Sequence, residues 1–522
     1  MIKFLWNSIW HKGNLIPKIL LLFGVVYLAA LTLGNLSNPI LDEYGFRQTQ
    51  TAITSYYFIQ DGYKLAYETP VVGYPWSIPF EFPIYQALVS FSVKVFSIPL
   101  TEAGRLLSLI FFLLTVFLLV RILKILNFSK NMAYVAAAVL VTSPLYLFYS
   151  GTFLIEAAAL FFAIAFLYFL ILLSLDTRNW NIKNISFLGI FLTLGLLQKL
   201  TTIFPLLMLS PFILFFALGK ENILILLRRP NTYIALLVGF ILPILVCGSW
   251  IHFTDQIKLE NVIGSALTSG QLRDWNFGSL KQRVSGALWL DTLYVRNILS
   301  SPFGWIGGLL VILGLIFANK KFKFILLICL ALGLAPLLIF TNLHIVHKYY
   351  QFANLLFYLI AIVISIQALI EYIPLKYRLI TFNVFAILLI ISNLLSFHAD
   401  YYKRKTTQIN LDNSELLRVA AYIKAHTPQD RPIIIYGLDW SSELPFYSER
   451  RALALPWGRW DMEALENPKK FLGNLSPSAV ILCGVYGQKE FNEISKTYKI
   501  LSKSTIDSCT IFLINISEVR VW

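Results

Sequence analysis

The chain has 522 residues, of which 57% are hydrophobic and only 14% are charged. Soluble globular domains carry about 25% charged residues, so this composition excludes an ordinary soluble protein and indicates that lipid solvates much of the chain. The formal net charge of +15 does not indicate a nucleic-acid partner. Lys and Arg stand in short clusters between apolar runs, as in the cytoplasmic loops of membrane proteins.

Long apolar runs recur over the first 400 residues. A membrane-spanning helix needs roughly 20 mostly apolar residues. Candidate spans are 17–34, 104–124, 132–149, 153–175, 185–200, 202–218, 232–251, 302–318, 323–340, 352–370 and 379–397. The sequence therefore predicts an α-helical polytopic membrane protein with about 11 transmembrane helices.

The basic residues predict the orientation of these helices. Lys and Arg gather in alternate connections, for example Arg121 with Lys124 and Lys320 with Lys321, whereas the long connection 35–103 is mainly acidic. By the positive-inside rule, we expect a cytoplasmic N-terminus and an extracytoplasmic loop 35–103. An odd number of spans then places the C-terminus outside as well.

The loop 35–103 has its own helical signals. Residues 47–60 and 84–97 read as helices that lie on the membrane surface. Between them, the Pro- and aromatic-rich stretch 70–83 excludes a regular helix.

The composition changes at about residue 400. Residues 412–425 predict an amphipathic helix, followed by buried strands at 432–436, 479–483 and 510–514. We therefore expect a transmembrane domain over 1–400 and a soluble α/β domain over 401–522. Cys483 and Cys509 fall in this tail; an extracytoplasmic tail would allow them to form a disulfide, and the sequence leaves that pairing open.

The polar cluster with the clearest functional signal lies near the start of the loop 35–103. Asp42 and Glu43 are adjacent carboxylates close to the end of the first span, and Arg47 follows them. Charges at a membrane boundary are costly to desolvate and often functional. A partly desolvated carboxylate suits a general base, and the guanidinium fork of Arg47 suits a carboxylate or a phosphate. The alternative is a solvated loop start.

Two further charges interrupt apolar runs on the same predicted face. Glu156 enters the outer end of an apolar helix, where it needs a partner or a proton. Lys199 stands between two apolar runs against the positive-inside trend, which suggests a phosphate ligand. The alternative for each is a side chain that snorkels to the lipid headgroups.

The fourth cluster, 342–351, also follows an apolar run. His344 and His347 would be one helical turn apart, but there is no H-E-x-x-H pattern and no evident third ligand, so a metal site is not indicated. We favour an anion site, and the alternative is an aromatic belt with basic anchors. The expected anion ligands are His347, Lys348, Tyr349 and Tyr350.

At these residues the sequence resembles the GT-C membrane glycosyltransferases, in particular the bacterial relatives of protein O-mannosyltransferases and aminoarabinose transferases in glycosyltransferase family 39. Residues 42–43 and 347–351 carry most of the resemblance. The stretches 74–83 and 436–440 are similar to bacterial members as well.

The resemblance implies a GT-C-like fold and an inverting transfer of a sugar from a polyprenyl-phosphate donor on the outer side of the bacterial inner membrane. Asp42 would be the catalytic base, with Glu43 beside it and Glu156 assisting or positioning the acceptor. The expected donor phosphate ligands are Arg47, Lys199, His347, Lys348, Tyr349 and Tyr350. The sequence indicates no definite cofactor, and a divalent metal stays open as an alternative that no motif indicates.

The acceptor stays open among a glycan, a lipid and a protein. The extra loop domain typical of eukaryotic protein mannosyltransferases is not evident in the sequence, so a lipid-linked or polysaccharide acceptor is at least as well supported as a protein. The competing hypothesis is a transporter or flippase for a lipid-linked glycan, and a third is a scaffold. Transporters place charges near the bilayer midplane and show repeat symmetry, whereas these charges lie at the predicted outer boundary.

Overall fold

The computed structural model describes residues 14–299, 302–456, 461–484 and 488–519, and the chain divides into two compact units. The helical unit comprises Met1–Leu36, Arg105–Gly248 and Arg273–Thr406. The mixed unit comprises Ser37–Gly104, Ser249–Leu272 and Thr407–Trp522. The loop after the first span and the C-terminal tail therefore belong to one folded body.

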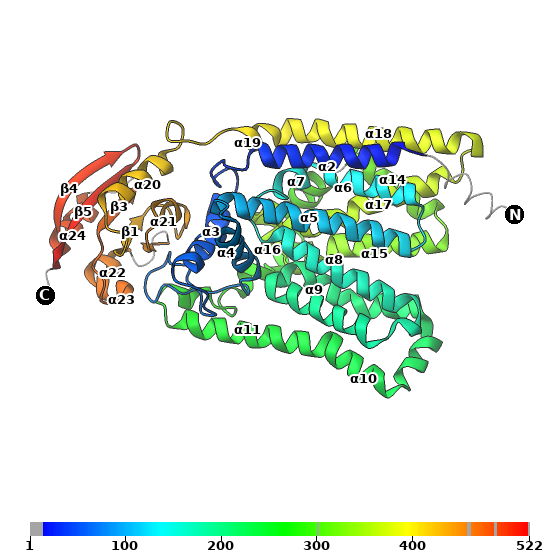
Figure 1. Ribbon diagram of the computed structural model, residues 1–522, viewed down its shortest axis with the longest axis horizontal. Coiled ribbons are helices and arrows are strands. Elements are labelled where there is room, and N and C mark those ends of the chain that lie inside the picture. Colours follow the sequence, from blue (N-terminus) through cyan, green and yellow to red (C-terminus); the bar gives the residue numbers. More distant parts are fainter. Residues whose placement is uncertain (1–13, 300–301, 457–460, 485–487, 520–522) are drawn as a thin grey trace. The chain divides into compact units, whose positions relative to one another are not determined.

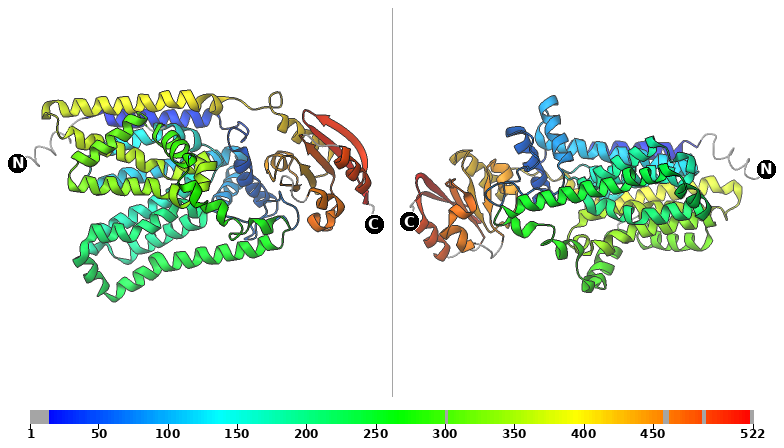
Figure 2. Two further views of the ribbon diagram at one scale, coloured as in Figure 1. Left: turned by 180° about the vertical axis from the view of Figure 1, so that it is seen from behind. Right: turned by 90° about the horizontal axis from the view of Figure 1, so that it is seen from below.

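Apolar helices dominate the chain up to residue 400, and in the helical unit they run side by side (Figures 1 and 2). Among the described residues, seven helical stretches are long and apolar enough to cross a membrane: α2 (Ile16–Gly34), α5 (Leu100–Ile125), α8 (Glu156–Leu175), α9 (Ile182–Leu227), α10 to α11 (Pro230–Leu259), α15 (Lys320–Ile339) and α18 (Leu375–Asp400). Shorter apolar helices are α4 (Ile84–Phe96), α6 (Lys130–Thr142), α14 (Trp305–Phe317) and α17 (Leu355–Ile370). Each predicted span overlaps at least one of these helices, so the multi-pass membrane fold is confirmed.

Two predicted spans differ in detail from the helices that form. The span 132–149 is divided into α6 and α7 (Pro144–Tyr149), because Ser143 precedes a proline and adopts an extended conformation with φ −62° and ψ 135°. The spans 185–200 and 202–218 both lie in α9, whose backbone leaves the helical conformation at Lys199 with φ −163° and ψ 95°. The break in α9 therefore falls on one of the predicted site residues.

The mixed unit contains a five-stranded sheet in the order β2-β1-β3-β5-β4. Its strands are β1 (Ile433–Tyr436), β2 (Ala452–Ala454), β3 (Ala479–Cys483), β4 (Tyr498–Ile506) and β5 (Cys509–Val519). β1 pairs in parallel with β2 and β3, whereas β5 is antiparallel to β3 and β4. The predicted helix at the start of the tail forms as α20 (Glu415–His426), and the predicted strands form as β1, β3 and part of β5.

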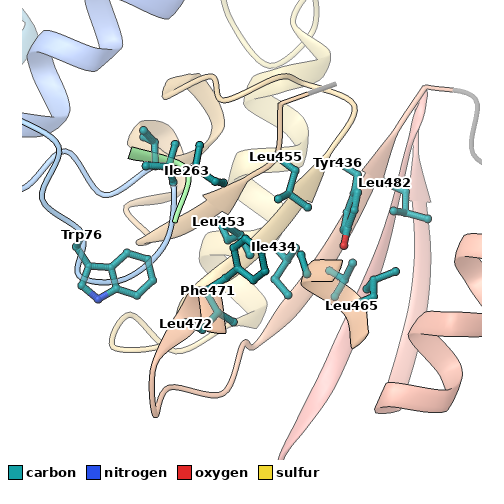
Figure 3. Close-up of a cluster of buried hydrophobic side chains, with 14 of the residues drawn as sticks. Trp76, Ile263, Ile434, Tyr436, Leu453, Leu455, Leu465, Phe471, Leu472 and Leu482 are labelled. Carbon is teal, nitrogen blue, oxygen red and sulfur yellow. The ribbon is translucent and has the colours of Figure 1, made fainter. Parts of the chain in front are cut away.

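Side chains from three parts of the chain form the core on one side of this sheet. Trp76 comes from the loop, Ile263 from the segment after α11, and Ile434 and Leu453 from the sheet (Figure 3). The loop also runs along the edge strand β2, where Ala452 N donates to Pro70 O at 2.9 Å and Ala454 N to Val71 O at 2.8 Å. These bonds cover a sheet edge that would otherwise present unpaired backbone groups.

The two helices predicted in the loop form as α3 (Gly45–Gln60) and α4, although most residues of α3 are buried within the protein. On α4, Leu88, Phe91, Val95 and Phe96 are exposed, as is typical of a helix that lies in a membrane interface. The stretch 70–83 forms no helix.

The two cysteines of the tail form a disulfide. Cys483 on β3 and Cys509 on β5 are register partners in the sheet.

Candidate functional site

The predicted site residues fall into two groups, one in each unit. Asp42, Glu43 and Arg47 lie in the mixed unit, at and just before the start of α3. The helical unit holds Glu156, Lys199 and the residues 347–350. Each group is a cluster of polar side chains with defined partners.

In the first group, the chain turns sharply into α3. Tyr44 adopts a left-handed conformation with φ 54° directly before the helix begins at Gly45. Asp42 Oδ1 accepts hydrogen bonds from Glu43 N at 3.1 Å and from Gln48 Nε2 at 2.6 Å. The half-buried carboxyl of Asp42 is thus held by its own helix start.

Arg47 has a partner that the sequence analysis did not identify. Its Nη2 donates to both carboxylate oxygens of Glu81, at 3.0 and 3.1 Å, and its Nη1 donates to Gln50. Burial opposes ionisation of Glu81, but the charge of Arg47 and the hydrogen bonds to the carboxyl together lower its pKa. Gln86 Nε2 adds a bond to Glu81 at 2.9 Å. The guanidinium therefore holds the loop together, and a phosphate would compete for donors already in use.

The C-terminal tail contacts this first group directly, within the mixed unit. The loop after β1 brings Trp440 into an edge contact with Phe46 at 5.1 Å between ring centroids. Ser442 Oγ donates to Phe46 O at 2.9 Å. Trp440, which ends the stretch noted for its resemblance, thus packs against the start of α3.

Glu443 is the residue in this region that sequence reasoning missed. It begins α21 (Glu443–Ser448) and lies so close to Gly45 that any β-carbon there would collide with its carboxylate. Burial raises the pKa of Glu443, although Ser441 Oγ donates a hydrogen bond to it at 3.1 Å. The sequence offers only a weak signal for it, namely its place three residues after Trp440.

In the second group, Glu156 and Lys199 form an ion pair between the start of α8 and the break in α9. The side chains are only 4% and 10% exposed. Lys199 Nζ also lies over the ring of Tyr350, 3.9 Å from its centroid, and 5.2 Å from that of Tyr349. The alternative interpretation, in which each charge snorkels to the lipid headgroups, does not describe this structure, because the two side chains are buried against each other.

The rings around Lys199 come from one short segment. His347 stacks on Tyr349 at 5.2 Å and on Tyr350 at 5.8 Å between ring centroids. Lys348 is half-buried in the same 3₁₀ turn, η5 (Lys348–Ala353). The structure therefore brings together Lys199, Tyr349, Tyr350 and His347 among the predicted phosphate ligands of the helical unit.

His344 is separate from this cationic group. It is buried in α16 (Thr341–Val346), and its Nδ1 lies 3.2 Å from Gln351 Oε1. Burial, with further contributions from Lys199 and Arg296, lowers the pKa of His344 to about 3. The imidazole is therefore neutral at physiological pH. Among the described residues, no group of three or more His, Cys, Asp or Glu side chains is arranged to hold a metal ion.

Comparisons with known protein families and solved structures identify proteins that this chain resembles. Residues 79–250 match the family described as dolichyl-phosphate-mannose-protein mannosyltransferase. No curated protein matches the chain by sequence. Among solved structures, ArnT from Cupriavidus metallidurans bound to undecaprenyl phosphate superposes with a TM-score of 0.61 at 11% identity, over 94% of this chain and 97% of that one. The chain has the fold of the GT-C membrane glycosyltransferases.

Two other solved GT-C structures also superpose on this chain. The Archaeoglobus fulgidus oligosaccharyltransferase tethered to an acceptor peptide gives a TM-score of 0.56 at 12% identity, over 98% of this chain and 75% of that one. The arabinofuranosyltransferase AftD from Mycobacteria gives 0.54 at 12% identity, over 97% of this chain but only 40% of AftD. The family match includes Glu156 and Lys199 and begins after Asp42.

Proposed function

We propose that this protein is an inverting glycosyltransferase that moves a sugar from a polyprenyl-phosphate donor to a glycan, lipid or protein acceptor. The observation that carries the proposal is a GT-C fold whose first loop opens with a carboxylate, Asp42, held in a defined hydrogen-bonded geometry. ArnT, of the same fold, has been solved with undecaprenyl phosphate, which supports this class of donor.

The roles follow from the chemistry of the two groups. Asp42 takes the proton of the acceptor hydroxyl, with Glu43 beside it, and the acceptor oxygen attacks the anomeric carbon of the donor. The bond from that carbon to the phosphate breaks, and cations stabilise the charge on the departing polyprenyl phosphate. We assign this second role to Lys199, with Lys348, His347, Tyr349 and Tyr350 as further ligands, and to Glu156 the task of holding Lys199. A single displacement inverts the anomeric configuration.

The transfer itself is directly testable. We expect the purified protein in lipid nanodiscs to move labelled sugar from an undecaprenyl-phosphate hexose or pentose to cell-envelope glycolipids and to release undecaprenyl phosphate in equal amount. Nucleotide sugars should not replace the lipid-linked donor. Transfer from nucleotide sugars alone, or no release of undecaprenyl phosphate from any lipid-linked sugar, would contradict the proposal.

We further propose that the protein lies in a bacterial inner membrane with a cytoplasmic N-terminus and with the loop 35–103 and the tail 401–522 outside. The Cys483–Cys509 disulfide supports this orientation, because disulfides persist in oxidising compartments and are rare in the cytosol. Residues 1–13 lie outside the described residues. The basic connections of the helical unit give the same orientation.

Single cysteines at exposed positions test this topology. Leu65 and Leu411 are 60% and 53% exposed in the mixed unit, and Tyr372, between α17 and α18, is 68% exposed. In intact cells, a membrane-impermeant maleimide should label Leu65→Cys and Leu411→Cys, and Tyr372→Cys only after permeabilisation. Cys247 and Cys329 are buried and should give a low background. The reverse labelling pattern would place the tail in the cytoplasm.

A further inference from the structure

Gln48 lies one turn into α3 and is completely buried. Its Nε2 donates to Asp42 Oδ1 at 2.6 Å and to the carbonyl oxygen of Glu43 at 2.9 Å. Because a carbonyl oxygen only accepts hydrogen bonds, the contact with Glu43 fixes which end of the amide faces Asp42. The atom beside the carboxylate is therefore the NH₂ group.

These contacts distinguish the two oxygens of Asp42. Oδ1 accepts from Gln48 Nε2 and also from Glu43 N at 3.1 Å. A proton on Oδ1 would face both donors, so Oδ1 is held as an acceptor in this arrangement. The same two bonds fix the plane of the carboxyl group.

We propose that Gln48 is a positioning residue for the transfer reaction, holding the carboxyl of Asp42 through Oδ1 in the orientation in which it removes the acceptor proton. This inference rests on the proposed function. In the step, the acceptor O–H bond breaks and its proton moves to the carboxylate of Asp42. The acceptor oxygen bonds to the anomeric carbon, and the bond from that carbon to the phosphate oxygen breaks, its electron pair leaving with the polyprenyl phosphate.

The charged groups around Asp42 within the mixed unit stay constant when Gln48 is changed. They include Glu43 next in the chain, Arg47 paired with Glu81, and Glu443 of α21 against Gly45. A change in the titration of Asp42 on replacing Gln48 therefore reports the loss of the amide.

The decisive variant is Gln48→Glu, which keeps the shape of the side chain but replaces the donor with a second carboxyl. Two carboxyls in hydrogen-bond contact share a proton and the pKa of one rises. The acid limb of the kcat/KM profile should therefore move to higher pH by about one unit or more. Gln48→Leu removes the donor without adding charge and should lower kcat roughly ten- to a hundredfold, with little change in the KM for donor.

A second readout does not depend on transfer. The pH at which a carbodiimide labels half of Asp42, followed by mass spectrometry of the folded protein, should rise in Gln48→Glu. Gln60 is the matched control, because it ends the same helix and is exposed; Gln60→Glu and Gln60→Leu should match wild type in every measurement.

The possible results distinguish the role of Gln48 from the proposed glycosyltransferase function. An unshifted pH profile and labelling midpoint in Gln48→Glu, with activity falling only as the folded fraction falls, would make Gln48 purely structural and overturn the inference. A wild-type protein that transfers no sugar would overturn the proposed function. The labelling midpoint would then still decide whether Gln48 controls Asp42.

Discussion

Asp42→Asn should lower the rate of sugar transfer by roughly 10²- to 10⁴-fold, the range that a positioned general base contributes. The asparagine keeps the size and planarity of the carboxyl, and its carbonyl oxygen can still accept from Gln48 Nε2 and Glu43 N, as Oδ1 of Asp42 does. What is lost is the ability to take a proton. The measurement is the initial rate of undecaprenyl phosphate release at saturating donor and acceptor.

The thermal unfolding temperature of Asp42→Asn in the same detergent should stay close to that of wild type, which separates chemistry from folding. Asp412→Asn makes the same change at an exposed aspartate of the mixed unit and should leave the rate unaltered. Glu43→Gln should be milder than Asp42→Asn. Normal transfer by folded Asp42→Asn would remove Asp42 from the role of base.

The membrane helices could be predicted because their signal is local. Apolar runs of the required length occur where α2, α8 and α18 form, and the turn-rich stretch 70–83 could be excluded from helix by its prolines. The strand β2 could not be found, since it has three residues and its pairing is with segments distant in the chain. For the same reason, the sequence did not indicate that residues 70–73 would line the edge of β2.

In the candidate site, too, single residues could be predicted from the sequence, whereas contacts between residues far apart in the chain could not. Charges that interrupt apolar surroundings, such as Glu156 and Lys199, are visible in the sequence. Their mutual ion pair is not, because 43 residues separate them and only the fold brings α8 against the break in α9. Arg47 was interpreted as a phosphate ligand, and its bidentate partner Glu81 lies 34 residues away. A sequence shows which charges need partners, but not which partners they find.

Lys199→Met should slow transfer roughly ten- to a hundredfold and weaken donor binding, since a hydrogen bond to a charged group contributes about 1.5–3 kcal/mol and charge on the phosphate grows as the sugar departs. The same substitution leaves Glu156 buried without its cation. Breaking a buried pair on one side costs about 3–5 kcal/mol in other proteins, so the stability of the helical unit should fall too. Activity alone therefore cannot assign the role of Lys199.

The double variant Lys199→Met/Glu156→Gln separates the two effects. It removes both charges, and replacing a whole buried pair by neutral groups is often close to neutral for stability. We expect the unfolding temperature to recover toward wild type while the KM for donor stays raised and kcat stays low, because the phosphate has still lost its cation. Glu156→Gln alone keeps the cation and should bind donor at least as well as the double variant. If the double variant recovers both stability and transfer, Lys199 serves only to neutralise Glu156, and the donor phosphate is held by other residues.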